Sequence, residues 1–427
     1  MNYRLSHVAF IILVIFVVTV MAPSPAWTKS FLIPMGKTQS NHLRAYGLIY
    51  HTLSNITTEK VHWLLNYRGG SFVVPARSEI RRWARLKGVT VEELSTARRV
   101  DIFNKISSRN MRKVPLEKAP DIAVYTPPGK DPWDDAVTLA LTYADIPFDK
   151  VYDKEVLDGK LNDYDWVHLH HEDFTGQYGK FYANYRNAPW YLSKVEDARK
   201  RAHKLGFESV QVEKKTVAKK ISDYVDQGGF LFAMCSAPET IDIALASQGV
   251  RIAPPEISGT PIDPQYRKKI VFEKTFAFKN FEIITDPSVY GHSNIDISPD
   301  PRNSDVRSER FELFPFSARY DPIPAMLTQN HKQVIKGFLG QTSTFNTDVI
   351  KSYVTRLAQL EDGRTKYIYG PYGDGLFSFY AGHDPEDFAH YVGDPHTNLK
   401  AHPNSPGYRL ILNNILFPAA EKPDLKT

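Results

Sequence analysis

The sequence has almost no cysteine. Cys235 is the only one among 427 residues, so intramolecular disulfides are excluded and the fold must depend on a hydrophobic core. An excess of one charge is also missing, because 53 basic and 48 acidic residues leave a formal net charge of +5. This charge is too small and too evenly spread to indicate a nucleic-acid partner.

Two nucleotide-binding motifs are absent as well. The chain contains neither a G-x-x-x-x-G-K-[ST] loop nor a G-x-G-x-x-G fingerprint. We therefore expect no cofactor. The remaining composition, with 42% hydrophobic and 24% charged residues, is that of an ordinary globular protein.

Long apolar runs are rare, and the clearest one lies near the start. Arg4 precedes an apolar stretch over residues 8–22, and Ser24-Pro25-Ala26 then gives a small-x-small cleavage site. This layout is typical of a secretory signal peptide. The run is shorter than the roughly 20 residues of a membrane span, so we expect residues 1–26 to be a signal peptide, with a retained anchor as the alternative. The expected product is exported, and periplasmic if the source is a Gram-negative bacterium.

The rest of the chain alternates between predicted strands and helices. Residues 27–118 form an N-terminal β/α segment, and a clearer alternation covers residues 119–427, interrupted by a loop-rich insertion at about 250–330. Strands that alternate with helices predict an α/β fold with a mostly parallel sheet and helices on both faces.

Three polar clusters follow predicted strands. Ligands of an open parallel sheet bind beyond the carboxyl ends of its strands. The clusters are His168, His170, His171, Glu172 and Asp173; then Cys235 and Ser236; and finally His383, Asp384 and Glu386. Neighbouring strands would bring these ends together, so we predict one site that contains all three.

Cys235 has the sequence setting of a nucleophile. It lies between the apolar run "GGFLFAM" and the helix-like stretch "PETIDIALASQ". A sharp strand-to-helix turn requires small residues two positions before and after, which Ala233 and Ala237 provide. A helix N-terminus also favours a thiolate. The alternative is a small buried cysteine with only a packing role.

His383 follows the apolar run "LFSFYAG" and would suit Cys235 as a general base. Asp384, Glu386 or Asp387 could orient its ring, whereas a capping role is the structural alternative for Asp384. His168 and His170 would share one face of a strand, as metal ligands can. We nevertheless expect no metal here, because histidines that hydrogen-bond a pocket wall are more common.

A second candidate for substrate binding lies in the N-terminal segment. "RGGSF" could hold an anion through Arg68 and its backbone amides, whereas a plain turn is the simpler interpretation.

Several stretches together resemble a known superfamily. "DIAVYTP", "DWVHLHHED", "GGFLFAMCSAPETID" and "FSFYAGHDPEDF" are similar to the class I glutamine amidotransferase-like fold. That resemblance implies a flavodoxin-like sheet with a cysteine on an elbow and a histidine after a late strand. "GHDPEDF" also resembles the ThuA-like branch, which is linked to sugar metabolism and generally lacks the nucleophilic cysteine.

The whole chain resembles bacterial proteins catalogued as asparagine synthetase B-like. The similar stretches are "QSNHLRAYG", "WLLNYRGGSF", "HLHHEDFTGQYGKF" and "SPGYRLILNNILFPA". A true synthetase of that kind has an N-terminal cysteine and an SGGxDS-type ATP loop, and this chain has neither. We expect an exported cysteine-dependent hydrolase or transferase acting on an amide-like carbonyl. The alternative is a non-catalytic ThuA-like module for a small-molecule, carbohydrate or cell-envelope ligand.

Overall fold

The protein has two β-sheets joined through shared helices. The computed structural model describes residues 29–55, 60–128, 135–298, 310–336, 342–386 and 395–421. The predicted signal peptide, residues 1–26, therefore lies outside the described residues. No helix in the described ranges is long and apolar enough to cross a membrane.

The first sheet contains five strands in the order β4-β1-β3-β2-β5. Their bounds are β1 (Ser30–Ile33), β2 (Val61–Leu65), β3 (Ser71–Pro75), β4 (Glu92–Leu94) and β5 (Arg112–Leu116). Helices α1 (His42–Asn55), α2 (Ser78–Lys87) and α3 (Thr96–Ser108) accompany them. Every neighbouring pair is antiparallel, so the mostly parallel sheet expected from the sequence does not extend to this part of the chain.

A tight turn explains the antiparallel pairing of β2 and β3. Gly69 and Gly70 in this turn have φ angles of 79° and 85°, which favour glycine. A side chain on Gly69 would also place its Cβ 2.4 Å from the Met35 carbonyl oxygen. The simpler interpretation of "RGGSF" from the sequence was a plain turn, and the structure shows that this turn closes a hairpin of β2 and β3.

The second sheet has nine strands in the order β11-β10-β12-β13-β14-β9-β8-β6-β7. Their bounds are β6 (Ile122–Tyr125), β7 (Asp149–Val151), β8 (Trp166–Leu169), β9 (Phe230–Met234), β10 (Arg310–Leu313), β11 (Val334–Lys336), β12 (Thr355–Leu360), β13 (Thr365–Tyr372) and β14 (Gly375–Tyr380). Strands β14, β9, β8, β6 and β7 are parallel. The other strands extend the sheet antiparallel from β14.

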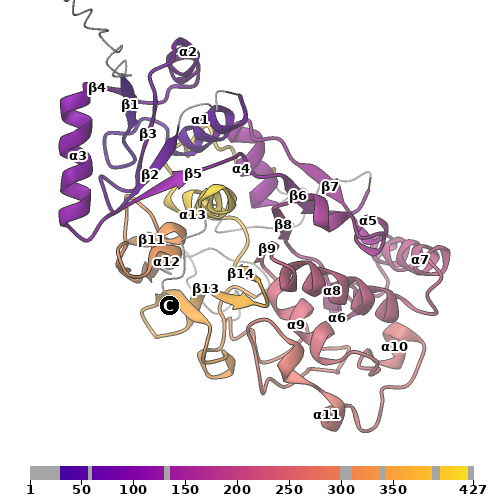
Figure 1. Ribbon diagram of the computed structural model, residues 1–427. Helices are drawn as coiled ribbons and strands as arrows, with labels where there is room; N and C mark the ends of the chain where they lie inside the picture. Colours follow the sequence, from indigo (N-terminus) through magenta and orange to yellow (C-terminus); the bar gives the residue numbers. More distant parts are fainter. Residues whose placement is uncertain are drawn as a thin grey trace, which may run out of the picture.

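Helices cover both faces of the parallel half (Figure 1). The longer ones are α4 (Ala136–Ala144), α7 (Pro189–Lys204), α8 (Val210–Asp226), α9 (Ala237–Ala246) and α13 (Pro406–Leu416). The shorter ones are α5 (Asp153–Leu157), α6 (Tyr182–Tyr185), α10 (Pro255–Ser258), α11 (Tyr266–Lys269) and α12 (Pro322–Leu327). Short 3-10 turns occur at Lys160–Asp163, Tyr178–Lys180, Phe272–Lys274, Thr347–Val349 and Phe417–Ala419.

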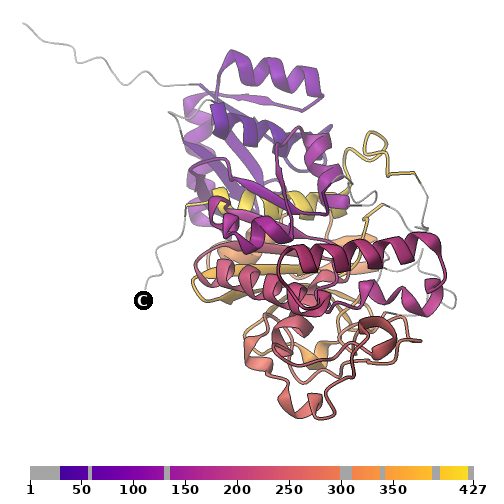
Figure 2. The same cartoon turned by 90° about the vertical axis from the view of Figure 1, so that its right-hand side faces the viewer.

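One hydrophobic core connects the two sheets. Helix α13 contacts both α1 and α4, and Figure 2 shows it in yellow between the N-terminal sheet and the nine-stranded sheet. The core includes Trp63 of the first sheet and Phe232 of the second. A separate core beneath α8 and α9 covers the other face of the nine-stranded sheet. The N-terminal segment and the larger sheet therefore pack as one body.

The predicted insertion is only partly outside the sheet. Residues 250–298 form loops with α10 and α11, as expected for a loop-rich segment. Strand β10 lies within the predicted 250–330 range, yet it pairs with β11 and β12. Residues 387–394, which contain the end of "FSFYAGHDPEDF", lie outside the described residues.

Candidate functional site

Cys235 lies in a strained turn between β9 and α9. Its φ angle of 55° is left-handed, a conformation that costs a non-glycine residue roughly 1–2 kcal/mol. The Cys235 backbone N–H donates to the Gly382 carbonyl oxygen over 3.0 Å. The thiol-bearing residue is only 2% exposed. The small neighbours Ala233 and Ala237 are both fully buried, so the turn is closely packed.

The three predicted strand ends meet at one edge of the sheet. Strand β9 lies between β8 and β14, and all three are parallel. The Ala237 N–H donates to the His170 carbonyl oxygen over 3.1 Å, which ties the turn after β8 to the start of α9. The rings of His170 and His383 are edge to face, with centroids 4.6 Å apart. The structure therefore brings Cys235, His170 and His383 into one region.

A buried carboxylate that the sequence analysis missed adjoins these histidines. Asp135 is 1% exposed and caps α4, since its Oδ1 accepts from the N–H groups of Val137 and Thr138. The same oxygen lies 3.4 Å from His168 Nε2 and 3.6 Å from His170 Nδ1. The only sequence signal for Asp135 is its place before a helix, which predicts a cap and nothing more.

Burial and charge act against each other in this cluster. Burial lowers the pKa of His170 to about 3, although the Asp135 carboxylate opposes that change. Burial raises the pKa of Asp135, but the two histidines lower it by more, so the carboxyl is ionised at neutral pH. His170 is therefore a neutral ring beside a carboxylate.

Asp384 and Glu386 have other partners than those predicted. Asp384 Oδ2 accepts from the Tyr408 hydroxyl over 2.5 Å, and its Oδ1 accepts from the Glu386 N–H over 2.9 Å. Glu386 Oε2 lies 3.3 Å from His402 Nδ1. Both carboxylates thus connect the chain after β14 to the region where α13 begins. Asp387, the third carboxylate considered, lies outside the described residues.

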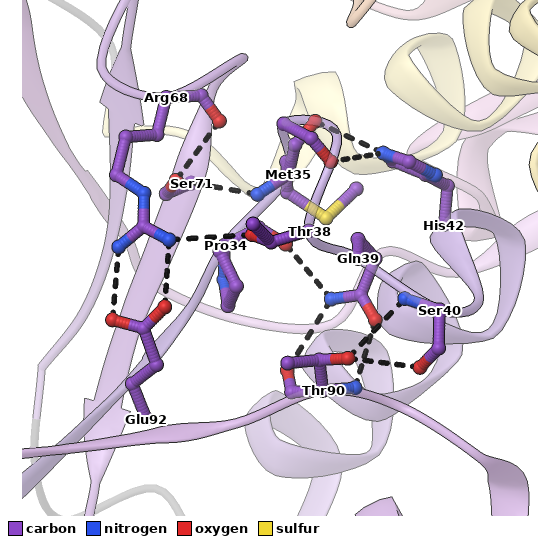
Figure 3. Close-up of polar contacts among 11 residues, drawn as sticks. Pro34, Met35, Thr38, Gln39, Ser40, His42, Arg68, Ser71, Thr90 and Glu92 are labelled. Atoms are coloured by element: carbon purple, nitrogen blue, oxygen red, sulfur yellow. Dashed lines mark hydrogen bonds and ion pairs between the residues drawn. The ribbon is translucent and has the colours of Figure 1, made fainter.

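Arg68 belongs to the other sheet. Its guanidinium pairs with Glu92 through two contacts of 2.9 and 2.6 Å and donates to the Thr38 hydroxyl over 3.3 Å (Figure 3). The bidentate partner is a carboxylate of the protein itself, so the plain structural interpretation of "RGGSF" fits the contacts better than an anion site.

The other two predicted residues flank the elbow. Ser236 is 1% exposed and is the N-cap residue of α9. Glu172 is half-buried, and its carbonyl oxygen accepts from the Thr240 hydroxyl over 2.7 Å. Both residues thus lie beside the start of α9.

A second buried polar group also escaped the sequence analysis. His292 Nε2 lies 3.5 Å from Asp173 Oδ2, and Glu239 in the first turn of α9 accepts from the hydroxyls of Ser293 and Thr342 over 2.7 and 2.8 Å. Burial raises the pKa of Glu239 to about 7, and His292 and the hydroxyls partly offset this. Residues from the predicted insertion therefore pack against the helix that follows Cys235.

Comparisons with known proteins show only distant structural similarity. No family model and no curated protein matches the chain. Cytoplasmic Protein STM3548 from Salmonella typhimurium is 13% identical with a TM-score of 0.35, over 71% of this chain and 100% of its own. Cytoplasmic Protein STM1381 from Salmonella typhimurium LT2 is 12% identical with a TM-score of 0.36, and the similarity covers 70% of this chain and 100% of that protein. A β-galactosidase from Bacillus circulans sp. alkalophilus is 11% identical with a TM-score of 0.24, and the similarity covers 69% of this chain and 32% of that protein.

Proposed function

We propose that the parallel half of the larger sheet is flavodoxin-like and carries a class I amidotransferase-like elbow. Numbered along the chain, its strands β6, β7, β8, β9 and β14 take the spatial order 2-1-3-4-5. This is the order of flavodoxin-like sheets. The position of Cys235 after the fourth parallel strand and of His383 after the fifth agrees with that proposal.

The proposed activity is cysteine-dependent hydrolysis or transfer at an amide-like or related carbonyl. The observation that carries it is the left-handed backbone of Cys235 between β9 and α9. A strained strand-to-helix turn presents a nucleophile at the top of a sheet, and such strain persists where function requires it. The expected substrate is a small-molecule or cell-envelope compound that contains such a carbonyl.

The proposed reaction proceeds through an acyl-enzyme. His383 takes the thiol proton, and the Cys235 sulfur attacks the carbonyl carbon to form a tetrahedral oxyanion. In this proposal the Ser236 backbone N–H stabilises the oxyanion, as the residue after the nucleophile does in elbows of this kind. The protonated His383 then donates to the leaving group, and water or another acceptor attacks the acyl-enzyme to release the product.

A ThuA-like binding module remains the second candidate. The 2% exposure of Cys235 favours it, because a thiol that no substrate can reach would have only a packing role. In that case the same edge of the sheet would bind a carbohydrate or cell-envelope ligand without chemistry. Both candidates are compatible with an exported protein, which we also propose from the signal-like start of the sequence.

Thiol labelling distinguishes the two candidates. Iodoacetamide should modify Cys235 in the folded protein at pH 6 to 7, and His383→Ala should slow that reaction at least tenfold. His203→Ala, at an exposed position of α7, should leave the rate unchanged and serves as the matched control. If labelling requires denaturant, or if His383→Ala leaves its rate unchanged, the nucleophile–base proposal is refuted and the binding module is the better explanation.

A further inference from the structure

The hydrogen of one buried histidine can be assigned from its surroundings. His168 is fully buried, and its ring stacks against those of Trp166 and Phe232, with centroids 5.8 and 5.6 Å away. His168 Nδ1 lies 3.1 Å from the backbone carbonyl oxygen of Phe232. A carbonyl oxygen only accepts hydrogen bonds, so Nδ1 must carry the hydrogen. In the neutral ring, Nε2 therefore carries a lone pair and no hydrogen.

That lone pair faces another acceptor. Nε2 of His168 lies 3.4 Å from Asp135 Oδ1 and has no hydrogen-bond partner among the described residues. His170 Nδ1 lies 3.6 Å from the same oxygen. Asp135 Oδ2 and both ring nitrogens of His170 also have no hydrogen-bond partner within the described ranges. His168 Nε2 and Asp135 Oδ1 are thus two buried acceptors that repel one another unless a positive charge lies between them.

The spacing of these atoms fits a metal ion better than a proton. Hydrogen bonds of this type are about 2.7–3.2 Å long, so both contacts exceed that range. Two ligands bound to one zinc ion at about 2.0–2.1 Å with tetrahedral angles lie about 3.3 Å apart. The candidate ligand atoms of Asp135, His168 and His170 all lie within 4.8 Å of one another.

The surroundings already hold the three side chains in position. The Phe232 carbonyl fixes the His168 ring, and the amides of Val137 and Thr138 fix the Asp135 carboxylate. Histidine ligands in metal sites commonly donate their second N–H to a backbone carbonyl in this way. The cluster also lies where β6 is followed by α4 and meets β8, at the point where the order of the parallel strands reverses. Ligands of open α/β sheets bind at such points.

We propose that Asp135, His168 and His170 bind one divalent first-row transition-metal ion. Two imidazoles and one carboxylate suit zinc, iron, cobalt or nickel, and they disfavour calcium and magnesium, which prefer oxygen ligands. Three protein ligands leave a coordination position open, as catalytic zinc sites do. The sequence favoured histidines that hydrogen-bond a pocket wall over histidines that bind a metal, whereas the geometry supports a metal site. His170 adjoins His383, but neither Cys235 nor His383 is one of the three ligands, so the proposal goes beyond the proposed function.

The metal content of the protein tests the proposal. Protein purified without chelator should contain about one equivalent of such a metal by elemental analysis. Asp135→Asn should weaken Zn²⁺ binding about 100-fold, because asparagine keeps the helix cap but removes the charge. His168→Gln should have a similar effect. After chelation, added Co²⁺ should give a visible ligand-field spectrum without sulfur-ligand bands, and added Zn²⁺ should raise the melting temperature of the wild type.

Two controls separate this site from others. Cys235→Ser and His203→Ala should retain the metal, so the outcome is independent of whether Cys235 is a nucleophile. Loss of the metal in Cys235→Ser would place it at the elbow instead. The proposal is overturned if wild-type protein neither contains nor binds a transition metal, or if Asp135→Asn and His168→Gln bind it as tightly as the wild type. Should either variant fail to fold, the wild-type titration and spectrum decide the question.

Discussion

The junction between the two sheets depends on a buried guanidinium, which can be tested by substitution. Arg409 on α13 is fully buried. Its Nη1 donates to the Met35 carbonyl oxygen over 2.8 Å, its Nη2 donates to the Gly69 carbonyl oxygen, and its Nε donates to the Tyr46 hydroxyl over 3.1 Å. Among the described residues no carboxylate pairs with it. Arg409 thus joins the C-terminal helix to two turns and one helix of the N-terminal segment.

Arg409→Met preserves length and apolar packing but removes these donors. The Gly69 carbonyl oxygen would then lose this donor, and the Met35 carbonyl oxygen would keep only its contact of 3.0 Å with His42 Nε2. A hydrogen bond from a charged group contributes about 1.5–3 kcal/mol. Removal of an unpaired buried charge returns part of that cost, since a guanidinium is itself expensive to desolvate. We therefore expect a net loss of about 3 kcal/mol in the free energy of unfolding.

Urea denaturation followed by circular dichroism measures this loss. The transition midpoint should fall for Arg409→Met, and tryptophan fluorescence should show the same lower midpoint because one core joins the two sheets. Arg186→Met, at an exposed position before α7, is the matched control and should change stability by less than about 0.5 kcal/mol. If Arg409→Met is equally neutral, the guanidinium does not hold the two sheets together.

Two further predictions concern buried ionisable groups. Burial lowers the pKa of His42 from 6.5 to about 4 and that of His331 from 6.5 to about 3. Both rings stay neutral when folded, so their stabilisation is complete above pH 6.5 and is lost as the pH falls toward the folded values. Urea midpoints should fall between pH 7 and 5, and the double substitution by glutamine should flatten that dependence; an unchanged midpoint contradicts it. Separately, Lys214→Met should cost about 3–5 kcal/mol, because it leaves the buried Asp153 carboxylate with Arg201 as its remaining cation. Calorimetry measures that cost, and a Lys214→Met/Asp153→Asn pair that is no more stable than Lys214→Met alone would refute the ion-pair explanation.

The sequence alone predicted the elements that local pattern controls. The apolar runs at β6, β8, β9 and β14 were recognisable as strands because each is short, buried and followed by polar or turn residues. The stretch "SPGYRLILNNILF" also has the local pattern of a helix, with Ser405 as N-cap and Pro406 in the first turn of α13. The turn at Cys235 was predicted from the small residues on either side of it.

Strand direction required the tertiary structure. Side-chain alternation along a strand is the same in parallel and antiparallel pairing. The local sequence therefore could not show that β2 and β3 form a hairpin, or that the sheet continues antiparallel beyond β14. Strand β10 lies in a segment whose prolines and aromatic residues suggested loops, yet it joins the sheet. Its partners β11 and β12 follow later in the chain.

Partner choice was decided only by the folded chain. The sequence analysis did not single out Asp135, and only the packing of β6 beside β8 brings it to His168 and His170. Asp384 adjoins His383 in sequence, yet its carboxylate accepts from Tyr408 on α13. Local composition determines whether a segment can form a helix or a strand, since that depends on neighbouring residues. Which buried polar groups compensate one another depends on contacts between residues far apart in the chain, and these exist only after the core has formed.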